Sequence, residues 1–185
     1  PSNASLVVAG DFDLDEARAL VKGLYGKIPG GTPPTHAKPV PAGLGKEERI
    51  TLADKVQLAR VSLIYHSPAI YADGDADLDI ASSVLGGGKS SRLYRSLVYE
   101  KKIAQDVRAV QASQLLGSLF EVQATARPGQ DLEALEKAMD EEIAKLKDVP
   151  PTSREIERAR NGYETGFWQR IEPIGGRADL LNGYQ

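Results

Sequence analysis

The two histidines, His36 and His66, are the side chains of this 185-residue sequence best suited to bind a catalytic metal. They lie in different segments, and neither has a second histidine at the spacing of a zinc motif. The sequence has no cysteine, and it contains neither HExxH nor the inverted HxxEH pattern. Because a catalytic zinc ion needs about three protein ligands in one place, we predict no catalytic, cofactor-binding or metal-binding residue in this segment.

The run Gly86-Gly87-Gly88-Lys89 with two following serines suggests phosphate binding at first sight. A phosphate-binding loop needs a further glycine five positions before the glycine that precedes Lys-Ser, and that position is Ser83. The loop should also follow a strand, whereas a helical pattern precedes it here. We therefore predict a break between two helices, with at least one glycine at positive φ and no bound nucleotide.

Four aspartates, at positions 73, 75, 77 and 79, alternate along the run DGDADLD and resemble a calcium loop. An EF-hand loop ends in a glutamate at its twelfth position, and counting from Asp73 that position is Val84. Acidic residues at the start of a helix are explained by the helix dipole. We interpret the run as a helix start.

Composition excludes several classes of function. The net charge is −3 and the isoelectric point is about 5.5, which gives no support for nucleic-acid binding or for a basic membrane surface. No apolar run approaches the roughly 20 residues of a membrane span. Residues 1–185 fit a single domain, and both ends look like cuts in a longer protein.

Periodicity predicts an α+β fold, namely a two-layer sandwich with a mostly antiparallel or mixed sheet and helices packed on one face. The expected core includes Leu20, Val21, Leu63, Leu135 and Ile143. The expected strands are Ser5–Phe12, Lys46–Asp54, Arg60–Ser67, Gln105–Ala112 and Ser118–Ala126, and the expected helices are Leu14–Tyr25, Asp75–Leu85, one from near Ser90, Asp131–Lys147, Ser153–Arg170 and Arg177–Gln185.

Several segments resemble, in order, the second domain of one half of an M16-family zinc metallopeptidase, the family of pitrilysin, insulysin and mitochondrial processing peptidase. They are VVAGDFDLDEARALVKGLYGKIPGG, VLGGGKSSRLYRSLVYEKKIAQDV, ATARPGQDLEAL, REIERARNGYETGF and GGRADLLNGYQ. The resemblance covers nearly the whole chain. It implies a fold of the LuxS/MPP-like metallohydrolase type.

The resemblance implies a mechanism for the parent protein. In such a peptidase the first domain binds zinc through HxxEH and a further glutamate, and the metal activates a water molecule. Peptide substrate lies along a sheet edge inside a chamber formed by two halves. None of the zinc ligands maps onto this segment. The expected partners are the zinc-bearing domain of the same chain, a second M16 half and the peptide.

In the partner half of this family, an Arg and a Tyr seven residues apart grip the substrate. Those positions correspond to Val98 and Gln105 here, which favours the domain attached to the zinc-bearing domain. Arg92, at the start of a helix, is the best candidate for contacting a substrate peptide. Two alternatives remain: a non-catalytic scaffold half, as in respiratory-complex core proteins, and a free-standing peptide-binding module. The compartment stays open between periplasm and cytoplasm.

Overall fold

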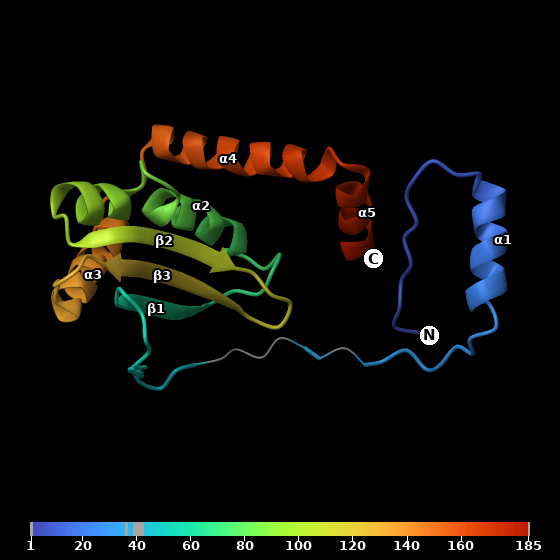
Figure 1. Ribbon diagram of the computed structural model, residues 1–185, viewed down its shortest axis with the longest axis horizontal. Coiled ribbons are helices and arrows are strands. Elements are labelled where there is room, and N and C mark those ends of the chain that lie inside the picture. Colours follow the sequence, from blue (N-terminus) through green and yellow to red (C-terminus); the bar gives the residue numbers. More distant parts are fainter. Residues whose placement is uncertain (1, 36, 39–42, 185) are drawn as a thin grey trace. The chain divides into compact units, whose positions relative to one another are not determined.

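Figure 1 shows the computed structural model, which describes residues 2–35, 37–38 and 43–184. His36 lies outside the described residues. Contacts between Cα atoms divide the chain into two compact units. The larger is Lys38–Arg160, and the smaller combines Pro1–Ala37 with Asn161–Gln185. The assignment of residues 1–185 to one domain stays a prediction.

The larger unit is built on a three-stranded antiparallel sheet of order β1-β3-β2. The strands are β1 (Arg60–Ser67), β2 (Ala104–Ala112) and β3 (Ser118–Ala126). Val122, on the central strand, pairs with Leu63 on one side and Ala109 on the other. Buried and less buried residues alternate along much of β3, as expected for a sheet that is covered on one face. The predicted α+β fold is confirmed.

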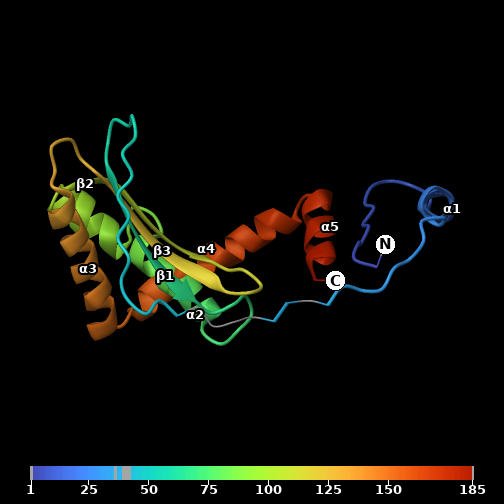
Figure 2. The same cartoon turned by 90° about the horizontal axis from the view of Figure 1, so that it is seen from below.

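Three helices of this unit pack against the sheet (Figures 1 and 2). They are α2 (Asp75–Gly86), the π-helix η1 (Tyr94–Glu100) and α3 (Leu132–Asp148). Leu135 is buried in the shared core, and Leu63 and Ile143 pack against it. The fully buried large apolar side chains come from these helices, from the residue just before η1 and from β3: Val84, Leu85, Leu93, Leu97, Leu135, Met139 and Val122.

The triple glycine serves both a turn and a close approach. Gly88 has φ 84°, so the predicted positive φ is confirmed. Gly86 lies so close to β2 that a Cβ atom there would come within 2.1 Å of the Ala109 backbone nitrogen. Only glycine fits such a contact without displacing the strand.

Two predicted strands are wrong. Residues 5–12 and 46–54 form no strand, and Leu6 and Ile50 are exposed. A strand needs a neighbouring strand for its backbone hydrogen bonds, and neither segment has one among the described residues. The second segment is tied instead to α3, through a two-pronged ion pair between Arg49 and Glu136.

The smaller unit holds α1 (Leu14–Tyr25), the end of α4 (Ser153–Ile171) and α5 (Ile174–Gly183). Asp13 caps α1, because its carboxylate accepts from the backbone amides of Asp15 and Glu16. The prediction that Leu20 joins the core is wrong, and α1 buries no side chain. Amphipathic spacing fixes which helix face is apolar but not what covers it.

Across the described ranges, no helix combines the length and the apolar character that a membrane crossing requires.

Candidate functional site around Arg92

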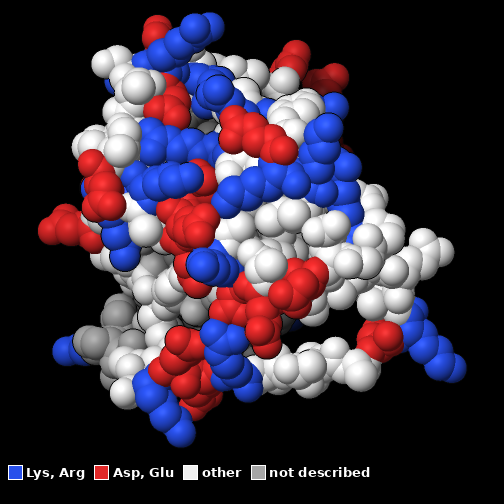
Figure 3. Space-filling model, turned by 90° about the vertical axis from the view of Figure 1, so that its left-hand side faces the viewer, with Lys and Arg blue, Asp and Glu red and all other residues white. Residues whose placement is uncertain are grey.

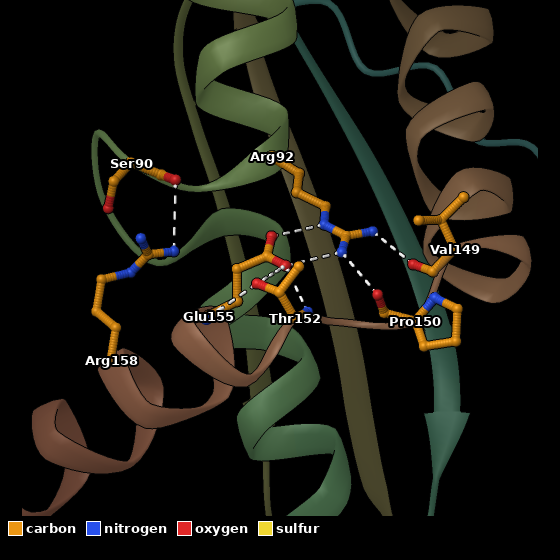
Figure 4. A network of polar contacts seen from close by, with 7 residues as sticks. All are labelled: Ser90, Arg92, Val149, Pro150, Thr152, Glu155 and Arg158. Atoms are coloured by element: carbon orange, nitrogen blue, oxygen red, sulfur yellow. Dashed lines mark hydrogen bonds and ion pairs between the residues drawn. The ribbon is translucent and has the colours of Figure 1, made fainter.

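Arg92, the predicted substrate contact, lies at the centre of a polar network at the start of η1 (Figure 4). Its Nε and Nη2 atoms donate to the two carboxylate oxygens of Glu155, at 2.8 Å and 3.0 Å. Nη1 donates to the carbonyl oxygen of Val149 at 2.8 Å, and Nη2 also donates to that of Pro150 at 3.3 Å. All three guanidinium nitrogens therefore bind other groups of the protein.

Glu155 joins this network to the start of α4. Its Oε2 accepts from the backbone amide and the hydroxyl of Thr152, at 2.8 Å and 2.9 Å. The Thr152 hydroxyl in turn accepts from the Glu155 amide at 3.3 Å, so the two residues form a capping box. The hydrogen bond from Arg92, followed by those from Thr152, lowers the pKa of Glu155 to about 2.

A second contact links α4 to the glycine-rich loop. Arg158 Nη2 donates to the Ser90 carbonyl oxygen at 3.5 Å (Figure 4). The loop that follows Gly86 and the helix that begins at Ser153 are thus held together by the side chains of Arg92 and Arg158. The Arg92–Glu155 pair is mostly withdrawn from water, and bidentate pairs of this kind are geometrically specific.

A buried carboxylate lies between η1 and α3. Glu142 Oε1 accepts from Ser96 Oγ at 2.9 Å and from Lys145 Nζ at 2.7 Å. The hydrogen bond to Glu142 raises the pKa of Lys145. Since a buried charge is tolerated only when it is paired, these contacts account for Glu142 at its position.

One of the four alternating aspartates is buried at the end of the sheet. Asp75 accepts from Ser113 Oγ at 2.6 Å, from Gln111 Nε2 at 2.9 Å and from the Tyr71 amide at 3.1 Å. The hydrogen bond from Ser113 lowers its pKa most, and burial opposes that shift. Protein donors thus occupy its oxygens, and within the described ranges no group of three His, Cys, Asp or Glu is placed to hold a metal ion.

The remaining predicted positions lie apart from this network. His66 is exposed on β1, opposite Leu119. Val98 is buried in the core, whereas Gln105 is exposed at an irregularity of β2. The structure therefore does not bring Val98 and Gln105 together as a gripping pair.

Charge is mixed on the face that Figure 3 shows, which is the α3 and η1 side of Figure 1. Lys and Arg side chains lie among Asp and Glu side chains there. Lys101 forms an ion pair with Glu141 at 2.9 Å, and Lys145 pairs with Glu142. The face carries no extended field of a single sign.

The comparisons with known proteins agree on one family. Residues 1–163 match the profile of the family described as the peptidase M16 inactive domain. The zinc protease PqqE of Helicobacter pylori is 28% identical over 187 residues, which cover 100% of this chain and 42% of that protein. The chain thus spans less than half the length of this curated relative.

Solved structures give the same picture. A protease from Helicobacter pylori superposes with a TM-score of 0.74 at 26% identity, over 95% of this chain and 43% of that one. An inactive peptidase domain from Bordetella parapertussis gives 0.64 at 28% identity, over 72% and 73%. A chain of complex III from Candida albicans gives 0.70 over 94% and 42%, but at 18% identity it shows only a common fold.

Proposed function

Since the chain belongs to the family of peptidase M16 inactive domains, we propose that it is the supporting, non-catalytic domain of a zinc-dependent endopeptidase. The observation that carries this proposal is the family match over residues 1–163, together with a zinc protease relative that aligns with the whole chain. The described residues offer no ligand group for zinc. The metal would therefore be bound by a domain outside this chain.

The parent enzyme would bury its peptide substrate in a chamber, and this domain would form part of the chamber wall. The two Helicobacter pylori relatives are more than twice as long as this chain, so they have room for a zinc-bearing domain beside it. A second M16 half would close the chamber. The substrate would be a peptide or an unfolded protein segment.

A domain that forms part of a chamber wall needs its loops in fixed positions, and the network around Arg92 holds one loop in this way. It joins the glycine-rich loop to the start of α4 through contacts of Arg92 and Arg158. The hydrogen bonds of Arg92 use Nε, both N–H groups of Nη2 and one of Nη1, which leaves one N–H for a substrate carbonyl. We keep Arg92 as the proposed substrate contact on that basis.

The proposal is tested by measuring zinc content and hydrolysis of an unstructured peptide, on the full-length protein and on this chain alone. We expect zinc and chelator-sensitive hydrolysis in the full-length protein only. A full-length protein that lacks HxxEH upstream of this segment, binds no zinc and cleaves no peptide would instead support the scaffold alternative. Peptide binding by the isolated chain, without any need for the remainder, would support the binding-module alternative.

A further inference from the structure

The sheet of the larger unit has one face that contributes nothing to the core. The core residues of its strands, among them Leu63, Ala109 and Val122, all belong to the face on which α2, η1 and α3 pack. Successive side chains on a strand point to opposite faces. The other face, which we call the open face, therefore consists of even-numbered residues 60–66 of β1, even-numbered residues 106–112 of β2 and odd-numbered residues 119–125 of β3.

Each strand contributes a charged residue to the open face. Arg60 lies on β1, Asp106 and Arg108 lie on β2, and Glu121 lies on the central strand β3. A sheet face that is buried beneath another layer is apolar, whereas a face that stays in water carries polar residues. These residue types, more than their exposed fractions, mark the open face as a surface that remains in contact with water.

An ion pair lies at the centre of the open face. Glu121 pairs with Ile64 on one side and Val110 on the other, and its carboxylate accepts from Arg108 Nη2 at 3.3 Å and from Gln123 Nε2. The Arg108 side chain is 58% exposed. Among the described residues, Glu121 is the recorded partner of its guanidinium, which leaves the N–H groups of Nε and Nη1 for other acceptors.

The chemistry of the open face fits a peptide better than other large ligands. Its charges balance, with Arg60 and Arg108 against Asp106 and Glu121, whereas a surface for nucleic acid or anionic lipid is basic. Arg108 offers donors for carbonyl oxygens, and Ile64 and Val110 offer apolar contact beside the Glu121 carboxylate. A peptide carries carbonyl groups, apolar side chains and charges of both signs, so it has a counterpart for each of these groups.

We propose that the open face is the surface of this domain that faces the peptide substrate, and that Glu121 and Arg108 determine which peptide charges it favours. The proposal rests on the proposed function, because it takes this chain as part of a peptidase. While the two charges cancel, the centre of the open face favours neither acidic nor basic peptides. Removing either charge should therefore create a preference, because a charged surface attracts ligands of the opposite sign.

Peptide hydrolysis by the full-length protein tests the proposal. Two unstructured peptides share one cleavable core and differ in flanking residues, which are glutamates in one and lysines in the other. We expect Glu121→Gln to raise the ratio of kcat/KM for the acidic peptide to that for the basic peptide by at least about threefold at low ionic strength. Arg108→Gln should lower this ratio to a similar extent, so a decisive variant remains if one of them folds poorly.

Glu133→Gln is the matched control. It removes the same charge from an exposed position on α3, in the helical layer of the sheet, and it should leave the ratio unchanged. An unchanged ratio in folded Glu121→Gln or Arg108→Gln protein would overturn the proposal, as would an equal shift in Glu133→Gln. Both results require that the unsubstituted protein cleaves the peptides, whereas an absence of zinc-dependent hydrolysis in that protein would overturn the proposed function and this inference with it.

Discussion

The guanidinium group of Arg92 holds both carboxylate oxygens of Glu155, a residue 63 positions later in the sequence. Only 17% of the Arg92 side chain and 20% of the Glu155 side chain are exposed. The pair therefore gains more from its mutual attraction than a surface ion pair would. It also fixes the connection between α3 and α4, because Arg92 binds the Val149 and Pro150 carbonyl groups as well.

Replacing Arg92 with alanine should lower the free energy of unfolding by about 2–4 kcal/mol, because it leaves the Glu155 carboxylate without its main partner. Urea unfolding of the chain measures this change. Arg158→Ala is the control, since the contact of Arg158 with Ser90 is long and exposed, and this variant should stay within about 0.5 kcal/mol of the parent. Similar small losses for both variants would contradict a structural role for Arg92.

The Arg92–Glu155 pair should also make stability depend on pH. The pKa of Glu155 falls from 4.5 to about 2 in the folded protein, so the unfolded chain binds the proton more readily. The stabilisation is therefore complete above about pH 4.5 and is lost as pH falls towards about 2, by roughly 3 kcal/mol at most. Glu155→Gln should flatten the unfolding free energy over this range. If Glu155→Gln left the dependence of the unfolding free energy on pH unchanged, other carboxylates would be its cause.

Gly86→Ala should destabilise the chain by at least about 2 kcal/mol, because the new Cβ atom would overlap the backbone of Ala109. Chemical denaturation provides the measurement. Gly45→Ala is the matched control, since nothing lies within 4 Å of a Cβ atom there. If the two variants were equally stable, the close approach of α2 to β2 would be wrong.

Leu135→Ala should cost about 2–5 kcal/mol, because Leu135 is fully buried beneath β3. Leu20→Ala should stay within about 0.5 kcal/mol, since Leu20 is exposed on α1. Following both variants by circular dichroism also tests the single-domain prediction, which requires one cooperative transition. A large loss from Leu20→Ala would show that α1 packs on a core.

The sequence predicted elements whose cause is local. The bounds of β1, β3 and α1 agree with the prediction residue for residue, and those of α3 and α4 lie within one residue. Spacing of apolar residues, helix caps and glycine breaks act within a few positions, so they can be recognised in one sequence. The predicted strands at residues 5–12 and 46–54 were wrong, because a strand also needs a neighbouring strand for its backbone hydrogen bonds.

At the candidate site, too, local features could be predicted from the sequence, whereas contacts between distant residues could not. The capping box of Thr152 and Glu155 spans three residues, and the start of the helix beside it was predicted, whereas the bond from Arg92 to Glu155 spans 63 residues and was missed. No periodicity brings those two residues together, since their meeting depends on how α4 starts beside η1. Asp75 was correctly placed at a helix start, but its partners lie far along the chain, Gln111 near the end of β2 and Ser113 just after it.

Reconstitution of the parent enzyme tests the central claim most directly. The remainder of the full-length protein is purified without this chain, and peptide hydrolysis is measured before and after the chain is added back. We expect the remainder to bind zinc but to cleave peptide far more slowly alone, and the added chain to restore chelator-sensitive hydrolysis without binding zinc itself. Full activity of the remainder alone, or stoichiometric zinc on the 185-residue chain, would contradict a supporting, non-catalytic role.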